Sequence, residues 1–201
     1  MRFKYLLIFL LILLVSPGTF AQKKTRVILK QADDLRIDER YGPNVQRLLG
    51  NVILKHDSTW FYCDSAYLNN KVNTFDAYGH VHINVNDTLD IYGDSLNYDG
   101  KTKIGEIHEN VKLVDKRATV TTDHLKFNRR TGVAYYYTGG VIVSEDNTLT
   151  SRIGHYYTRK EEFHFKDDVV LTNPDYVMNS DTLVYHTVTE EAYFNGPTTI
   201  V

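Results

Sequence analysis

Two short phrases recur through the sequence with a period of about 29 residues, and this repeat constrains the fold more than any other feature. The first phrase opens as GNVIL at Gly50, and its later copies begin at positions 79, 109, 139, 167 and 196. Its third residue is Val52, Val81, Val111, Val141, Val169 and, in the last copy, Thr198. The second phrase, such as DSLNY, begins at Asp33, Asp64, Asp94, Asp123, Arg152 and Asp181. Two phrases that share one period indicate a stacked repeat architecture.

Each repeat carries the pattern of two antiparallel strands. A polar turn such as Asp57-Ser58 or Asp99-Gly100 follows each phrase, and such residues close tight hairpins. Apolar and polar residues alternate between the turns, which predicts strands at 72–85 and 88–98. The 15 tyrosines, with many valines, isoleucines and threonines, also favour strands. We therefore expect an all-β chain that forms one stacked antiparallel meander.

Glycine often opens the first phrase in the middle of a predicted strand, as at Gly50, Gly79, Gly139, Gly140 and Gly196. Glycine at such a place permits a bulge or a bend. Bends at matching places in successive strands would fold the meander along one line into an elongated trough with two walls. About eleven strands spaced about 4.8 Å apart would make a trough on the order of 50 Å long.

The apolar residues of both phrases should point into this trough. The candidate lining residues are Val52, Leu54, Val81, Ile83, Leu96, Tyr98, Val111, Leu113, Leu125, Phe127, Val141, Val143, Val169 and Leu171. Two interpretations remain open. Either the walls touch and these residues form an ordinary core, or the walls separate and leave an apolar groove for acyl chains, each CH₂ of which would contribute about 0.8 kcal/mol.

Positions 1–21 have the pattern of a secretory signal peptide. Arg2 and Lys4 precede an apolar run over residues 5–15, and Thr19 and Ala21 supply the small residues of a cleavage site. The run is short for a transmembrane helix, although an uncleaved anchor remains an alternative. We expect a signal peptide at 1–21, a lead-in at 22–30, and one repeat domain of about six repeats at 31–201.

Charge and cysteine content limit the partners and the chemistry. Without the signal peptide the chain has 25 acidic and 21 basic residues, a net charge of about −4. This balance argues against nucleic acid, whose phosphates require clustered Lys and Arg. Cys63 is the only cysteine, so an intramolecular disulfide is excluded.

Residues that could carry catalysis or bind metal do not form a recognisable pattern. His80 and His82 could share a metal ion, but no further histidines or acids recur at matching repeat positions beside them. The aspartates that open the second phrase could form a calcium-binding or sugar-binding row, but Arg152 interrupts it, and capping of turns and strands explains them more simply. We expect no catalytic residues, no metal site and no cofactor.

The export signal, the long repeat period and the two phrases together resemble the OstA-like family, over residues 30–201. That family includes the periplasmic lipopolysaccharide-bridge protein LptA and the N-terminal domain of the outer-membrane translocon LptD. The resemblance implies an elongated, bent β-jelly-roll that is not an enzyme. It implies that the chain binds lipopolysaccharide or a related lipid in the periplasm and serves outer-membrane assembly, with association with that membrane as a further expectation.

Unpaired edge strands predict further partners, because an open meander leaves backbone amides free at both ends. Other OstA-like domains, from a second copy or from an outer-membrane translocon, could add at these edges. Two alternatives remain open: a structural or adhesive β-solenoid without a lipid ligand, and a carbohydrate-active β-helix enzyme. The hairpin signals favour antiparallel strands over the parallel coil that such an enzyme would need.

Overall fold

In a computed structural model, described for residues 25–37, 40, 42–144 and 146–201, the chain forms a single antiparallel sheet of fifteen strands. The strands are β1 (Ile28–Gln31), β2 (Asp34–Ile37), β3 (Val45–His56), β4 (Thr59–Asn69), β5 (Thr74–Val85), β6 (Leu89–Asp99), β7 (Ile104–Val114), β8 (Thr119–Asn128), β9 (Val133–Tyr136), β10 (Gly140–Ser144), β11 (Asn147–Ser151), β12 (Ile153–Tyr157), β13 (Glu162–Asn173), β14 (Tyr176–His186) and β15 (Glu191–Ile200). The expected all-β meander is confirmed. The predicted signal peptide lies outside the described residues.

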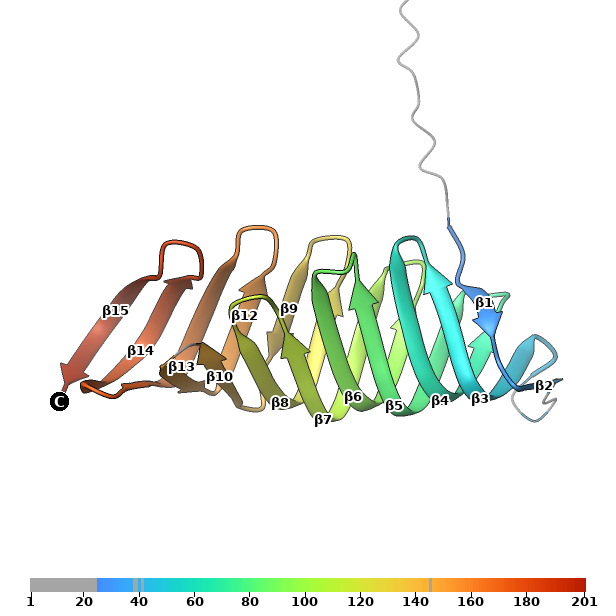
Figure 1. Cartoon of the computed structure of the whole chain (residues 1–201), viewed down its shortest axis with the longest axis horizontal. Coiled ribbons are helices and arrows are strands. Elements are labelled where there is room, and N and C mark those ends of the chain that lie inside the picture. The colour runs from blue at the N-terminus through green and yellow to red at the C-terminus, as the bar shows by residue number, and fades with distance from the viewer. Residues whose placement is uncertain (1–24, 38–39, 41, 145) are drawn as a thin grey trace, which may run out of the picture.

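The strands follow one another along the long axis in nearly their order in the sequence (Figure 1). Six short strands occur two by two: β1 and β2, β9 and β10, and β11 and β12. The two members of each set form hydrogen bonds with different halves of the same long strand. Each short pair is therefore one long strand interrupted in the middle. Among the described residues, no helix is long and apolar enough to cross a membrane.

The interruption is a crease that every long strand crosses. In β3 the backbone of Gly50 and Asn51 is left-handed, with φ of 72° and 46°, and the pairing with β4 shifts between Leu49 and Val52. Such a bulge bends its strand and changes its direction. Because the bulges line up across the sheet, the sheet folds along one line into two walls, as the recurring glycines predict.

The crease does not always contain glycine. Glu109 and Asn110 in β7, and Asp167 and Asp168 in β13, have the same left-handed backbone, with φ between 51° and 63°. For a residue with a side chain this conformation costs about 1–2 kcal/mol, and the cost is lowest for Asn and Asp. The crease therefore follows the repeated phrase also where glycine is absent.

The aspartates of the second phrase lie beside the crease of the neighbouring strand. Asp33 accepts a hydrogen bond of 2.8 Å from Asn51, and Asp94 accepts one of 2.6 Å from Asn110. Asp64 and His80 make the same contact at 2.8 Å. In the fifth copy the charges are exchanged, since Arg152 stands in the aspartate row and pairs with Asp167 of the crease. The aspartates of the second phrase therefore bind side chains at the crease. Arg152 makes the same contact with the positive and negative partners exchanged.

Candidate functional site

The space between the two walls is the candidate site, and ladders of apolar side chains line it. We call the wall that contains residues 52–62 the first wall, and the wall that contains residues 65–78 the second wall. Along the first wall, residues that lie directly opposite each other on neighbouring strands form one continuous ladder. Its members are Leu54, Phe61, Ile83, Ile91, Leu113, Val120, Ile142, Leu149, Leu171, Met178 and Ile200.

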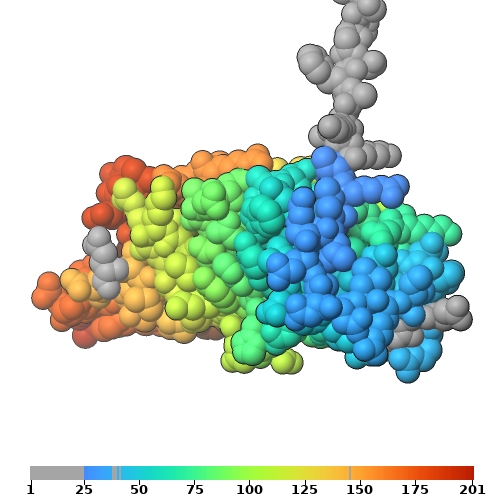
Figure 2. All heavy atoms as spheres, turned by 45° about the vertical axis from the view of Figure 1, so that its right-hand side comes forward, coloured from blue at the N-terminus to red at the C-terminus, as the bar shows by residue number. Residues whose placement is uncertain are grey.

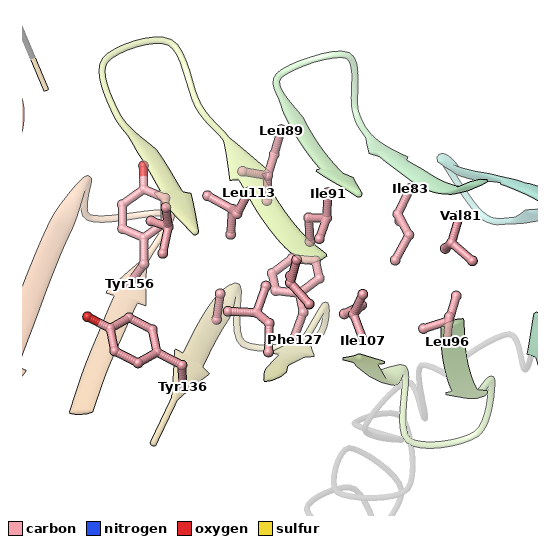
Figure 3. Packing of buried hydrophobic residues seen from close by; sticks show 14 of the residues in the cluster. Val81, Ile83, Leu89, Ile91, Leu96, Ile107, Leu113, Phe127, Tyr136 and Tyr156 are labelled. Atoms are coloured by element: carbon pink, nitrogen blue, oxygen red, sulfur yellow. The ribbon is translucent and has the colours of Figure 1, made fainter. Parts of the chain in front are cut away.

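The two walls touch over most of their length. Ile83, Ile91 and Leu113 of the first wall face Leu96, Ile107 and Phe127 of the second (Figure 3). Near the N-terminal end, the Phe61 ring of the first wall lies 5.1 Å from the Phe75 ring and 4.8 Å from the Tyr98 ring, measured between centroids. Side chains at such separations are in direct contact. This part of the interior is a packed core.

Twelve of the fourteen candidate lining residues are buried in this interior. They are Val52, Leu54, Val81, Ile83, Leu96, Tyr98, Val111, Leu113, Leu125, Phe127, Val169 and Leu171. The inward orientation expected of Val141 and Val143 is wrong, because their side chains are 37% and 47% exposed. Ile142, between them, is buried and takes the place in the ladder.

A difference in the crease explains this error. In the third copy it is Val111, the second residue after Glu109, that lies opposite Thr122 of β8. In the fourth copy it is Gly140, the first residue after Gly139, that lies opposite Thr122, so the crease ends one residue earlier within the phrase. A slip of one residue exchanges the two faces of a strand. The phrase GGVIV therefore presents Ile142 to the interior.

The interior opens toward the C-terminal end of the sheet. A hollow of about 180 Å³ lies between the walls there. Its lining includes Ile142, Leu149, Phe165, Leu171, Leu183, Tyr185 and Ala192. Of the fourteen candidate residues only Leu171 lines it. Ile142 was missed because of the one-residue shift in β10.

Turns form two rims along the upper edges of the walls (Figure 1), and we call the space between them the mouth. Asp57 on the rim of the first wall forms an ion pair of 2.7 Å with Lys103 on the opposite rim, and lies 3.5 Å from Arg129. Beneath them, the buried His56 and Tyr98 rings share a hydrogen bond of 2.8 Å across the mouth. These contacts hold the two rims together.

The charges at the mouth shift the ionisation of its residues. Partial burial by itself would raise the pKa of Asp57, but hydrogen bonds from Lys103 and Thr25 and the nearby charges lower it to about 2. Burial lowers the pKa of His56, so its ring is neutral at pH 7. Burial also raises the pKa of Tyr98 to about 12, against the opposing effect of Arg129. At this part of the mouth the ionised Asp57 is therefore held between two cations.

Further contacts cross the mouth at both ends of the molecule. Toward the C-terminal end, Tyr156 donates a hydrogen bond of 2.6 Å to Asp115, and Arg117 donates one of 2.7 Å to the backbone of Thr187. Toward the N-terminal end, the segment at Thr25 and Val27 lies over the mouth. Thr25 bonds His56 at 2.9 Å, and the Val27 amide donates to Asn73 on the opposite rim at 2.9 Å. Figure 2 shows this segment, in dark blue, descending from the upper edge.

One group of side chains could bind a metal ion. Glu106, His108 and His124, on the second wall, have ligand atoms within 4.8 Å of one another. Burial, and then the proximity of His108, lowers the pKa of His124 and favours the neutral ring that metals bind. Lys126 competes for Glu106 at 2.7 Å. Sequence reasoning missed this group because its members come from two strands that pair only in the fold.

The histidines that the sequence did single out do not come together. His80 bonds Asp64, whereas His82 bonds Asp90 at 2.7 Å and stacks on Tyr92. Cys63 is buried as a free thiol, and burial raises its pKa to about 12, so it is a poor nucleophile.

Comparisons with known proteins agree with this geometry. A family model described as OstA-like protein matches residues 24–181. A search of curated proteins finds no match. The fold is similar to the crystal structure of LptH, the LptA-homologous periplasmic component of the lipopolysaccharide transport device from Pseudomonas aeruginosa. The TM-score is 0.51 at 10% sequence identity, over 56% of this chain and 93% of LptH. At this identity the similarity concerns the fold.

Proposed function

Because the chain belongs to the OstA-like protein family, we propose that it is a non-enzymatic lipid carrier that binds the acyl chains of lipopolysaccharide or a related lipid between its two walls. The observation that carries the proposal is the continuous apolar interior, which ends in an open hollow of about 180 Å³. LptH, whose fold is similar, is described as a component of a lipopolysaccharide transport device. By the same analogy, this chain acts in the periplasm and serves assembly of the outer membrane.

An acyl chain enters at the hollow, where the walls are already apart. Leu149, Leu171 and Leu183 offer it an apolar surface on both walls. Each CH₂ that leaves water contributes about 0.8 kcal/mol, so a chain gains affinity as it advances between the walls. The ladder of the first wall is apolar throughout, so none of its members would fix the chain at one depth. This uniformity suits a carrier that must also release its lipid.

Other OstA-like domains add to the edges of the sheet, from a second copy or from an outer-membrane translocon. Among the described strands, β15 pairs only with β14, and its free edge exposes Tyr193 and Ile200. At the opposite edge Leu35 and Ile37 of β2 are exposed. Edge-strand addition satisfies the free amides and continues the interior from one domain into the next.

Site-specific photo-crosslinking in a cell that makes lipopolysaccharide tests the carrier. A crosslinking residue replaces Ile142 or Leu171, which line the hollow, and Val141 or Val143 serve as matched controls on the same wall. We expect lipid adducts at the first two positions and none at the controls. Equal labelling of both sets, or labelling of neither, would show that the interior does not hold lipid.

A structural or adhesive β-solenoid is the second candidate, because contacts such as Phe61 with Phe75 fill most of the interior. A solenoid of this kind binds no lipid, so the absence of adducts at Ile142 and Leu171 would favour it. Adducts at those two positions alone would exclude it.

A further inference from the structure

The rim of the second wall carries a ladder of basic residues. Its turns recur with the period of the chain and place Lys71, Lys101, Arg130 and Arg159 at matching positions of successive repeats. Each repeat adds two strands, so successive members stand about 10 Å apart along the rim. Backbone hydrogen bonds join turn to turn, among them Gly100 N to Asn73 O at 2.8 Å.

Hydrogen bonds to the backbone of the preceding turn fix two of the guanidinium groups of this ladder. Arg130 donates a hydrogen bond of 2.9 Å to the carbonyl of Lys101, and Arg159 donates one of 2.8 Å to the carbonyl of Arg130. Each contact uses one N–H, and a guanidinium has five. The remaining donors are available to a ligand, and the turns that carry them are fixed relative to one another.

A hollow of about 530 Å³ lies against this rim, and its charged lining residues are all basic. They are Arg26, Lys71, Lys101, Lys103, Arg129, Arg130 and Arg159. Asp57 pairs with Lys103 and Arg129. The side chain of Asp99 accepts hydrogen bonds from the amides of its own turn, including that of Lys101 at 2.7 Å. Within the described part of the chain, Lys71, Lys101, Arg130 and Arg159 form no ion pair.

We propose that this hollow binds the phosphate groups of a glycolipid headgroup. The proposal rests on the proposed function, since a lipid whose acyl chains lie between the walls leaves its headgroup at the mouth beside this rim. Arginine forks match phosphate oxygens, and several cations spaced along a rim suit a head that bears more than one phosphate. Because the chain is acidic overall, this group of unpaired cations is a local feature that a ligand of opposite charge would match.

Binding of two purified lipids to the full chain tests the site. The probes are bisphosphorylated lipid A and the same acylated disaccharide without phosphates, with inorganic pyrophosphate as a third, acyl-free probe. The variant combines Lys101→Gln, Arg130→Gln and Arg159→Gln. The control neutralises three exposed cations elsewhere on the sheet, and it combines Lys30→Gln, Lys112→Gln and Lys166→Gln.

We expect the unaltered chain to prefer the phosphorylated lipid at least tenfold. The rim variant should lose that preference through weaker binding of the phosphorylated lipid, with unchanged binding of the other, and the control should behave as the unaltered chain. Equal affinity of the unaltered chain for both lipids, or an unchanged preference in the rim variant, would overturn the headgroup site and leave the carrier intact.

The third probe separates the two proposals. If neither lipid binds, the carrier proposal fails, and the headgroup site fails with it as a lipid site. Pyrophosphate binding that the rim variant alone abolishes would then assign the rim to a free phosphate compound. A melting temperature within about 2 °C of the unaltered chain confirms that each variant is folded.

Discussion

Asp57 offers the most direct test of how the mouth is held closed. Its pKa falls from 3.8 to about 2, and one pKa unit corresponds to about 1.4 kcal/mol. Because solvent screens the charges at the mouth, the ionised carboxylate stabilises the fold by about 1–2 kcal/mol. The Asp57→Asn substitution removes the charge and keeps the shape. Asn also tolerates the left-handed backbone at this position, where φ is 56°.

The sign of the pH dependence follows from the direction of the shift. The folded pKa of Asp57 is depressed, so its contribution is complete above about pH 4 and is lost as the pH falls toward 2. We expect Asp57→Asn to lower the free energy of unfolding by about 1–2 kcal/mol at pH 7, and the difference between the two proteins to shrink to a small fraction of this by about pH 2 and to vanish below it. Urea unfolding followed by the fluorescence of Trp60, on the adjoining strand β4, measures this difference locally.

The matched control is Asp87→Asn in the corresponding turn between β5 and β6. Asp87 also has φ of 56°, and it forms no ion pair within the described residues. Its substitution should change the free energy of unfolding by less than about 0.5 kcal/mol. Equal losses in the two variants, or a loss in Asp57→Asn that persists unchanged at pH 2, would refute an electrostatic closure of the mouth.

Two further predictions concern the crease, and thermal unfolding followed by circular dichroism checks both. Gly79→Ala should lower the stability of the fold by more than Gly139→Ala does. Both glycines have left-handed φ, but only at Gly79 would the new Cβ meet a side chain, that of Asp64, at 2.3 Å. Equal losses of stability would mean that backbone strain alone matters. Arg152→Asp should destabilise by about 1 kcal/mol through repulsion from Asp167, and adding Asp167→Gly should restore stability. If the double variant stays as unstable as the single one, the exchanged pair does not hold the crease.

The repeat made most of the fold predictable, because strand period, turn residues and mid-strand glycines all indicated the same creased meander. The crease follows the phrase also at Glu109 and Asp167, where residues with side chains in place of glycine accept the left-handed backbone. Sequence reasoning failed to give the orientation of Val141, since the crease of that copy ends one residue earlier within the phrase. Where a crease ends depends on the pairing with the neighbouring strand, which composition and spacing do not reveal.

The candidate site was predictable as a set of inward ladders but not as an open or filled space. Whether walls touch depends on side-chain volumes facing each other across the fold, such as Phe61 against Phe75 and Tyr98. The basic rim was hidden for a different reason. The net charge of about −4 averages over the whole chain, whereas Lys101, Arg130 and neighbouring cations gather only when the turns of successive repeats are stacked.

A filled interior and a carrier function are compatible on energetic grounds. An acyl chain that advances between the walls replaces contacts between the two walls by contacts between the acyl chain and each wall. The apolar side chains of the walls therefore remain out of water, and the net gain in free energy is that of burying the acyl chain itself. At about 0.8 kcal/mol per CH₂, three methylenes offset the roughly 1–2 kcal/mol that ionised Asp57 contributes to the closed mouth. Because the contacts of each repeat are confined to nearby repeats, the walls can separate over a short stretch while the more distant repeats remain packed. In the proposed carrier, the chain therefore advances stage by stage from the open hollow, and at each stage it has to overcome only the local mouth contacts.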